Sequence, residues 1–160
     1  FVKMKKLMLL AGLYCLQPTL QAAPAHSNGK HDVVPANARD RALAHFKDNY
    51  AWVDDAVWYT TTENSLYCTF RQGNIRNRVF YDQHGNWQYT LLSYPPSVLA
   101  KSVTDLISEN FHGYRLSFVN EIHTGDQEPT YVINLENNDY IKVVHVTGDN
   151  FEIRRAFDKK

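Results

Sequence analysis

The chain has 160 residues, with 17 basic and 17 acidic side chains, so its formal net charge is zero. This balance provides no basic footprint for a phosphate backbone, and it therefore excludes general nucleic-acid binding as the expected role. Aromatic residues make up 13% of the chain, a content that favours a folded domain with a well-filled sheet core.

The N-terminal segment is typical of an export signal. Lys5 and Lys6 precede an apolar run over residues 7–16, and small residues follow at Ala22 and Ala25. A basic start, a short apolar core and small residues after it are the design of a secretory signal peptide. The core is too short to span a bilayer comfortably. We therefore expect a signal peptide at residues 1–25, cleaved after Ala22 or Ala25, and a periplasmic or secreted protein without stable membrane insertion after cleavage.

Cleavage changes the charge and the cysteine content of the chain. Loss of the three lysines in the signal segment leaves a mature net charge near −3. Cys68 is then the single cysteine, so an intramolecular disulfide is excluded. Residues 26–34 are mainly polar and are predicted to form a flexible N-terminal segment. Residues 35–160 are the expected single domain.

Hydrophobic periodicity then predicts one helix and four strands, twice. Ala38, Ala42, Phe46 and Tyr50 recur every four residues and indicate a helix over residues 35–50. Short β-branched and aromatic runs between turn residues predict strands at residues 56–62, 66–71, 75–81 and 87–92. The pattern continues with a second helix at residues 98–110 and strands at residues 115–123, 130–136, 140–146 and 151–157.

The order of these elements indicates an internal duplication. Phe46 corresponds to Phe111, and Cys68 corresponds to Ile133, both at an offset of 65 residues. We therefore predict an α+β fold with an antiparallel sheet of about eight strands and helices packed on one face. Two tandem helix-plus-four-strand repeats, at residues 35–94 and 95–160, would build this sheet. A plain α+β domain without duplication is the alternative, because side-chain identity between the halves is weak.

The third and fourth strands form the hairpin that sets the predicted register. Asp82 can start a turn through its side chain, and Gly85 can take a positive φ, so residues 83–85 are the expected loop. This register predicts a core side formed by Val79, Tyr81, Trp87, Tyr89 and Leu91. It predicts an exposed side formed by Arg76, Arg78, Phe80, Gln88 and Thr90.

The preceding turn at Gly73 and Asn74 extends both sides to the second strand. It pairs Cys68 with Val79 on the core side. On the exposed side it pairs Arg71 with Arg76, Thr69 with Arg78 and Tyr67 with Phe80. In the second half, the analogous pattern predicts an exposed side formed by Val132, Asn134, Lys142, Val144, Glu152 and Arg154, with a loop of two or three residues near Asn137.

These features resemble a known family. The proline-opened helix, the aromatic residue near its end and the motif YDxxGNW at residues 81–87 are similar to the PepSY-like periplasmic protein family. The second half resembles it through PPSVLAKSVTDLISENFHGY and TYVINLENNDYIKVVHV, but has TGDN at residues 147–150 in place of the motif. The resemblance covers residues 34–157. It implies an exported domain with a fold similar to that of β-lactamase inhibitory protein and a role in protein binding or inhibition, and the family has no established catalytic residues to carry over.

The sequence lacks the motifs of common catalytic sites. It contains no GxSxG elbow, Walker A loop, dinucleotide fingerprint or HExxH motif. Cys68 alternates with Leu66 and Phe70, so we expect it to fill the core instead of acting as a nucleophile. The histidines at positions 45, 84, 112, 123 and 145 are scattered and do not indicate a metal site. We therefore expect no enzyme activity, no cofactor and no metal.

Three arginines and two aromatic residues form the candidate partner-binding site. These residues are Tyr67, Arg71, Arg76, Arg78 and Phe80, and both residue types are enriched at protein interfaces. The sequence favours an exported, non-catalytic module, inhibitory or otherwise, that binds a protein or peptide partner, with an acidic partner as the best match. A structural envelope protein with a merely solvated face is the alternative, and a small-substrate envelope enzyme is a third hypothesis. The sequence assigns neither a particular partner nor an oligomeric state.

Overall fold

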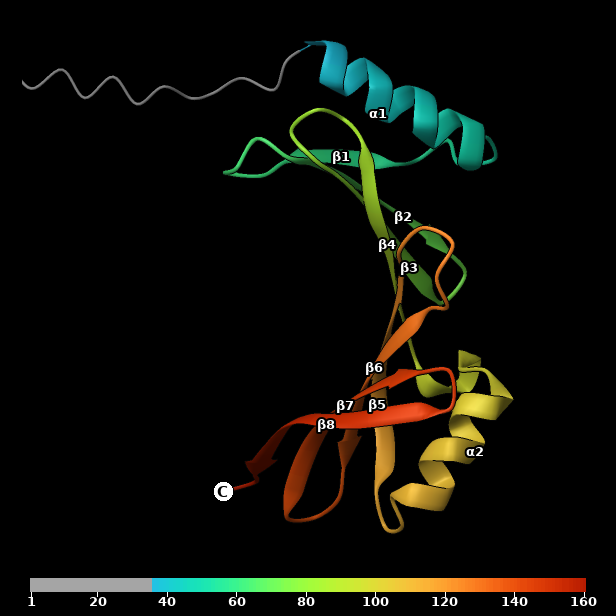
Figure 1. The fold of residues 1–160 in the computed structure, drawn as a ribbon, viewed down its shortest axis with the longest axis vertical. Helices are drawn as coiled ribbons and strands as arrows, with labels where there is room; N and C mark the ends of the chain where they lie inside the picture. The colour runs from blue at the N-terminus through green and yellow to red at the C-terminus, as the bar shows by residue number, and fades with distance from the viewer. Residues whose placement is uncertain (1–35) are drawn as a thin grey trace, which may run out of the picture. The chain divides into compact units, whose positions relative to one another are not determined.

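The computed structural model of the protein describes residues 36–160. The predicted signal peptide, the predicted N-terminal segment and Pro35 lie outside the described residues. The described chain is an open antiparallel sheet of eight strands with two α-helices, as Figure 1 shows. The strand order in the sheet follows the order in the chain, from β1 to β8. The predicted α+β class and strand number are therefore confirmed.

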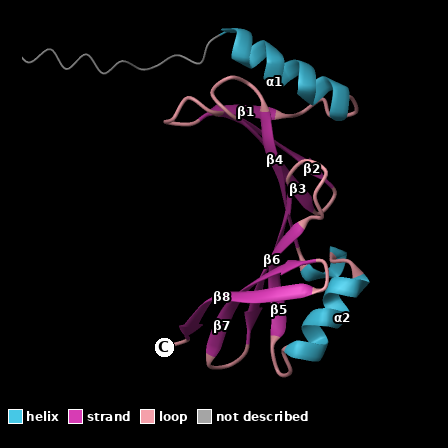
Figure 2. Ribbon diagram, viewed as in Figure 1, coloured by secondary structure: helices cyan, strands magenta, loops and turns pink. Residues whose placement is uncertain are grey.

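The helices and strands lie close to the predicted positions (Figure 2). Helix α1 spans Ala36–Asn49 and α2 spans Lys101–Asn110, and a 3-10 turn, η1, precedes α2 at Pro96–Val98. The first four strands are β1 at Val57–Thr60, β2 at Leu66–Gln72, β3 at Ile75–Tyr81 and β4 at Trp87–Tyr94. The last four are β5 at Arg115–His123, β6 at Thr130–Glu136, β7 at Tyr140–Thr147 and β8 at Asn150–Asp158.

Two predicted elements are three residues longer than the observed ones. The second helix begins at Lys101 and not at residue 98, because Leu99 and Ala100 are extended, with ψ near 140° at both residues. Strand β1 ends at Thr60 because the next residue enters a turn. The Thr61 N–H donates to the Ser65 carbonyl at 2.8 Å, and Asn64 takes a positive φ of 60°.

Each helix packs on its own cluster of buried side chains. Ala42 and Phe46 of α1 pack with side chains of β2 and β3, namely Leu66, Cys68, Phe70, Val79 and Tyr81. Val103 and Ile107 of α2 pack with side chains of the later strands, including Val119, Ile133, Leu135, Val144 and Val146. The apolar stripe predicted for the first helix is therefore the surface that α1 buries, and α2 buries an apolar surface in the same way.

The hairpin between β3 and β4 has the predicted loop. The Asp82 N–H donates to the Asn86 carbonyl at 2.9 Å, and the Gly85 N–H donates to the Asp82 carbonyl at 3.0 Å. The Asp82 carboxylate accepts hydrogen bonds from the His84 and Asn86 N–H groups at 2.8 and 2.9 Å. Desolvation acts to raise the pKa of Asp82, but these hydrogen bonds outweigh it and lower the pKa. The turn therefore favours an ionised Asp82.

The predicted register between β2 and β3 is confirmed, but the register between β3 and β4 is wrong beyond the first pair. Tyr81 lies opposite Trp87 as expected, but a bulge shifts the next pair to Phe80 and Tyr89. One extra residue in a strand moves all following side chains to the other face. Thr90 is therefore buried opposite Val79, and Tyr89 and Leu91 lie on the face that carries Arg78 and Phe80.

Hydrogen bonds explain how Thr90 can be buried. The indole N–H of Trp87 donates to the Thr90 hydroxyl oxygen at 3.1 Å. The same hydroxyl lies 3.2 Å from the phenol oxygen of Tyr50. A buried polar group is costly only when it lacks partners, so these contacts stabilise the bulged register.

The predicted register of the second half is also wrong by one residue. Val132 lies opposite His145, and Asn134 lies opposite Val143, since the loop after Asn137 holds two residues. Lys142 and Val144 therefore belong to the opposite face. Val144 is fully buried, and the Lys142 ammonium lies 4.4 Å from the ring centroid of Tyr114. Glu152 lies opposite His145 and so shares a face with Val132, and its carboxylate forms an ion pair with Arg154 at 3.0 Å.

Candidate partner-binding face

The face of β1–β4 opposite the α1 cluster, called the open face here, carries a row of four aromatic rings. Tyr59 stacks on Tyr67 with ring centroids 4.9 Å apart. Tyr67 stacks on Phe80 at 5.4 Å, and Phe80 stacks on Tyr89 at 4.4 Å. The ring planes differ by only 13–23°. The row crosses four strands, from β1 to β4.

Three arginines lie further along the same strands. Arg71 on β2 lies opposite Arg76 on β3, and Arg78 is two residues further along β3. Directly opposed side chains in a sheet have Cβ atoms about 5 Å apart, so the three guanidinium groups form one cluster. Arg71 and Arg76 are exposed, and Arg78 is half-buried. Within residues 36–160, none of the three forms an ion pair.

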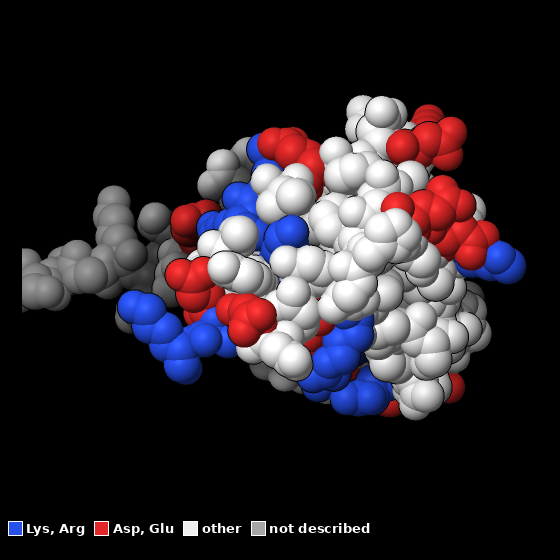
Figure 3. All heavy atoms as spheres, turned by 90° about the horizontal axis from the view of Figure 1, so that it is seen from below, with Lys and Arg blue, Asp and Glu red and all other residues white. Residues whose placement is uncertain are grey.

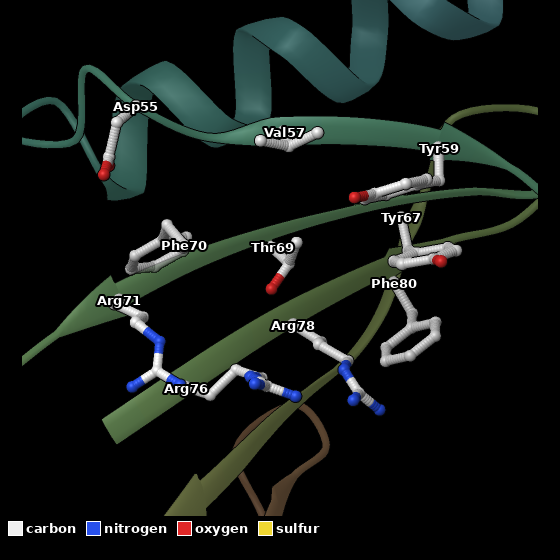
Figure 4. A pocket seen from close by; sticks show the side chains of 10 residues that line it. All are labelled: Asp55, Val57, Tyr59, Tyr67, Thr69, Phe70, Arg71, Arg76, Arg78 and Phe80. Atoms are coloured by element: carbon white, nitrogen blue, oxygen red, sulfur yellow. The ribbon is translucent and has the colours of Figure 1, made fainter. Parts of the chain in front are cut away.

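A hollow of about 770 Å³ joins the arginine cluster to the aromatic row. Figure 4 shows Arg71 and Arg76 at one end, Tyr59, Tyr67 and Phe80 at the other, and Arg78 in between. Val57 and Thr69 lie between them, and Asp55 lies at the rim. The structure thus brings together all five residues of the predicted site, Tyr67, Arg71, Arg76, Arg78 and Phe80.

Several residues of this face were not predicted as part of the site. Tyr59 comes from β1, whose register the sequence did not define. Tyr89 and Leu91 were placed in the core because the bulge in β4 has no signal in the sequence. The alternation of Val57 and Tyr59 with Trp58 in β1 is the one pattern that could have added Tyr59 to the aromatic row.

The arginine cluster is a local feature of the surface. Figure 3 views the molecule from below relative to Figure 1, and basic and acidic side chains are interspersed over that side. The chain has no excess of basic residues. Attraction to a negatively charged partner would therefore arise at the cluster itself, through short-range contacts, and not from the field of the whole protein.

Cys68 and His45 are two further side chains whose chemistry follows from their surroundings. Cys68 is fully buried, and burial raises its thiol pKa to about 12, so it is not a nucleophile at neutral pH. Burial lowers the pKa of His45, against a smaller opposite effect of Asp48, and its ring lies 3.2 Å from the Tyr81 hydroxyl. No group of three or more metal-ligating side chains occurs among residues 36–160.

The comparisons with known proteins identify a fold. No family model matches the sequence, and no curated protein matches it. A structure of a DUF2874 family protein from Bacteroides ovatus matches with a TM-score of 0.61 and 15% identity, over 78% of this chain and 86% of that one. A BLIP-like protein from Bacteroides fragilis matches with a TM-score of 0.60 and 12% identity, over 74% and 84% of the two chains.

A third structure has the same architecture. It comes from Bacteroides eggerthii, is described as "putative periplasmic proteins", and matches with a TM-score of 0.59 and 13% identity, over 74% of this chain and 87% of that one. At these identities the likeness concerns the fold alone. The chain therefore has a BLIP-like α+β fold, which agrees with the fold expected from its sequence motifs.

The described helices also bear on membrane insertion. Neither α1 nor α2, the two α-helices within residues 36–160, is long and apolar enough to cross a membrane.

Proposed function

We propose that the protein is an exported, non-catalytic module that binds a protein or peptide partner on the open face of its sheet. The proposal rests on one observation: three arginines without an ion-pair partner in residues 36–160 lie beside four stacked aromatic rings. The proposed contact residues are Tyr67, Arg71, Arg76, Arg78 and Phe80. The proposed partner presents carboxylates.

The physical argument concerns the free and bound states of the arginine cluster. Three neighbouring guanidinium groups repel one another mildly while the face is free. A partner's carboxylates would remove this repulsion and form charge-assisted hydrogen bonds, which are stronger than neutral ones. The aromatic row would add apolar contact area, and Arg and Tyr are among the residues that dominate binding energy at interfaces.

Export, periplasmic location and PepSY-like family membership belong to the same proposal. They are supported by the signal-like N-terminal sequence and by the YDxxGNW motif. A structural neighbour described as "putative periplasmic proteins" and one described as BLIP-like are consistent with them. An inhibitory role follows only from the resemblance, so the proposal extends to binding and leaves the partner's identity open.

We also propose that the chain consists of two tandem repeats with both helices on one face of the sheet. One helix and four strands occur twice in the element order. The register places Tyr94 opposite Val119, Val119 opposite Ile133 and Ile133 opposite Val144. All four are buried, which supports one continuous covered face from β4 to β7.

Export predicts a shorter chain in the cell envelope. Intact-mass analysis of protein from the envelope fraction should find an N-terminus near Ala23 or His26, because signal peptidase cleaves after small residues. Soluble cytoplasmic protein that retains the complete N-terminal segment would contradict this expectation.

Affinity capture tests the binding role. With the mature protein as bait in an envelope extract, Arg76→Ala/Arg78→Ala should reduce recovery of a specific partner. Truncating an anchor residue at an interface typically costs about 2 kcal/mol or more. Arg39→Ala/Arg41→Ala is the matched control, because it removes the same charge from exposed positions on α1.

The two variants separate the proposal from its alternative. Binding at the open face predicts loss of the partner with the Arg76 and Arg78 variant only. A structural envelope protein with a merely solvated face predicts no difference between the two variants. If the two variants recover every captured protein equally well, the proposed binding role of the open face is contradicted.

A further inference from the structure

The side chains on the open face recur at every second residue of each strand, which is the interval at which an extended chain presents its side chains. Arg76, Arg78 and Phe80 occupy alternate positions along β3. The neighbouring strands follow the same order: Arg71, Thr69 and Tyr67 on β2, and Ser93, Leu91 and Tyr89 on β4. The face is therefore cationic and polar near the turn at Gly73 and aromatic at the other end.

The spacing of these rows fits an extended partner better than a helical one. Alternate residues of a strand are about 6.8 Å apart, so Arg76 and Phe80 are about 14 Å apart along β3. An extended segment presents every second side chain at the same interval. On a helix, the side chains at positions i+4 and i+8 are rotated about the helix axis by about 40° and 80° relative to position i. A helix therefore cannot place all three side chains over residues that lie in a line along β3.

The arginine cluster stands between two hollows, which leaves room for apolar side chains on both flanks. The first hollow is the one of about 770 Å³ that contains the aromatic row. The second has a volume of about 480 Å³, shares all three arginines, and is also lined by Leu91 and Phe118. Phe118 is 42% exposed, although it is a large apolar residue.

We propose that the open face binds an extended segment of a partner protein that carries acidic, acidic and apolar side chains at three successive alternate positions. The two carboxylates would lie over Arg76 and Arg78, and the apolar side chain would lie over Phe80. In aligned packing of sheet layers the strands lie within about 30° of each other, and the proposed segment lies over the face in this way, along β3. This inference rests on the proposed binding function and goes beyond it by specifying the order of the recognised side chains.

Three capped synthetic peptides, the first two of equal composition, test that order. The probes are Glu-Thr-Glu-Thr-Leu, its permutation Glu-Thr-Leu-Thr-Glu, and the uncharged Gln-Thr-Gln-Thr-Leu. The permutation places leucine in the centre and so breaks the order in either chain direction. In an NMR titration of the mature protein, the first peptide should bind at least about ten-fold more tightly than either other peptide. It should also shift the amide signals of Arg76, Arg78 and Phe80.

Protein variants show whether the preference arises at the proposed residues. Arg76→Ala/Arg78→Ala should abolish the preference for glutamate over glutamine, and Phe80→Ala should reduce the preference for the ordered peptide over its permutation. Arg39→Ala/Arg41→Ala should change neither.

Two results would overturn the inference. Equal affinities for the ordered and permuted peptides would show that charge alone is recognised. Absence of binding by all three peptides at about 1 mM would exclude this class of ligand. Either result leaves the proposed function standing if partner capture still depends on Arg76 and Arg78, whereas capture that ignores both arginines contradicts the proposed function itself.

Discussion

Val79→Asp should lower the free energy of unfolding by at least about 3 kcal/mol, because it places an unpaired carboxylate in the core. Val79 is fully buried in the α1 cluster, between Cys68 on β2 and Thr90 on β4. Burial disfavours the ionised form and raises the carboxyl pKa. A group whose pKa is raised by folding loses stability as pH rises, so the deficit should be smaller near pH 3 than at pH 7.

Arg78→Asp is the control for this prediction, because residue 78 is adjacent in the chain but lies on the open face. A surface substitution usually changes stability by about 0.5 kcal/mol or less. Chemical denaturation of both variants at neutral pH measures the difference. Equal destabilisation would contradict the assignment of the two faces.

Gly85→Ala should be strongly destabilising, because the glycine satisfies two demands at once. Gly85 has a φ of 80°, in the region that favours glycine, and it is buried against the first turns of α1. A Cβ at this position would overlap the backbone carbonyl of Ala38. We expect a loss of about 3 kcal/mol or more, the sum of backbone strain and a clash that backbone atoms cannot easily relieve.

Gly73→Ala separates these two contributions. Gly73 also has a positive φ, of 58°, but a Cβ there would have no neighbour within 4 Å. Its replacement should cost only the backbone strain, about 1–2 kcal/mol. If thermal or chemical unfolding shows equal losses for the two variants, the contact between the hairpin loop and α1 is not what makes Gly85 necessary.

The predictions for Val79 and Arg78 depend on which face of the sheet each residue occupies. The sequence defined these faces well in β2 and β3. Leu66, Cys68 and Phe70 alternate with polar residues, and Val79 and Tyr81 alternate with Arg78. A slip of one residue would place arginine in the core, so a single register is physically acceptable. The short turn at Gly73 then leaves no freedom in the pairing, and the prediction for these two strands was correct.

The register of β4 could not be predicted in the same way. Trp87, Tyr89 and Leu91 form one apolar set, and their alternation agrees with the simple hairpin that the loop residues suggest. The bulge is stabilised by the buried Thr90 hydroxyl, whose partners are Trp87 and Tyr50. Tyr50 is 40 positions away in the sequence, so this contact becomes visible only in the folded chain.

The second half was ambiguous for a different reason. Residues 140–147 read YIKVVHVT, in which apolar residues occur at both odd and even positions. Such a run fits either face equally well. The position of Lys142 on the covered side is possible because its ammonium lies over the ring of Tyr114, and its long stem can remain in apolar surroundings.

The candidate site was predictable to the extent that it belongs to one hairpin. Tyr67, Arg71, Arg76, Arg78 and Phe80 all lie on β2 and β3, where the register was secure. Tyr59 and Tyr89 complete the aromatic row from the two flanking strands, which required the pairing of β1 and the bulge in β4. Pairing within one hairpin therefore predicted the residues at the centre of the open face. The flanking residues Tyr59 and Tyr89 depended on contacts that only the folded chain shows.

The affinity of a captured partner tests the binding role of the open face most directly. Calorimetry with the purified partner should give a dissociation constant at least about thirty-fold higher for Arg76→Ala/Arg78→Ala than for the unaltered protein, the equivalent of about 2 kcal/mol. The Arg39→Ala/Arg41→Ala control should keep the original value. Equal dissociation constants for all three proteins would contradict a partner site at the arginine cluster.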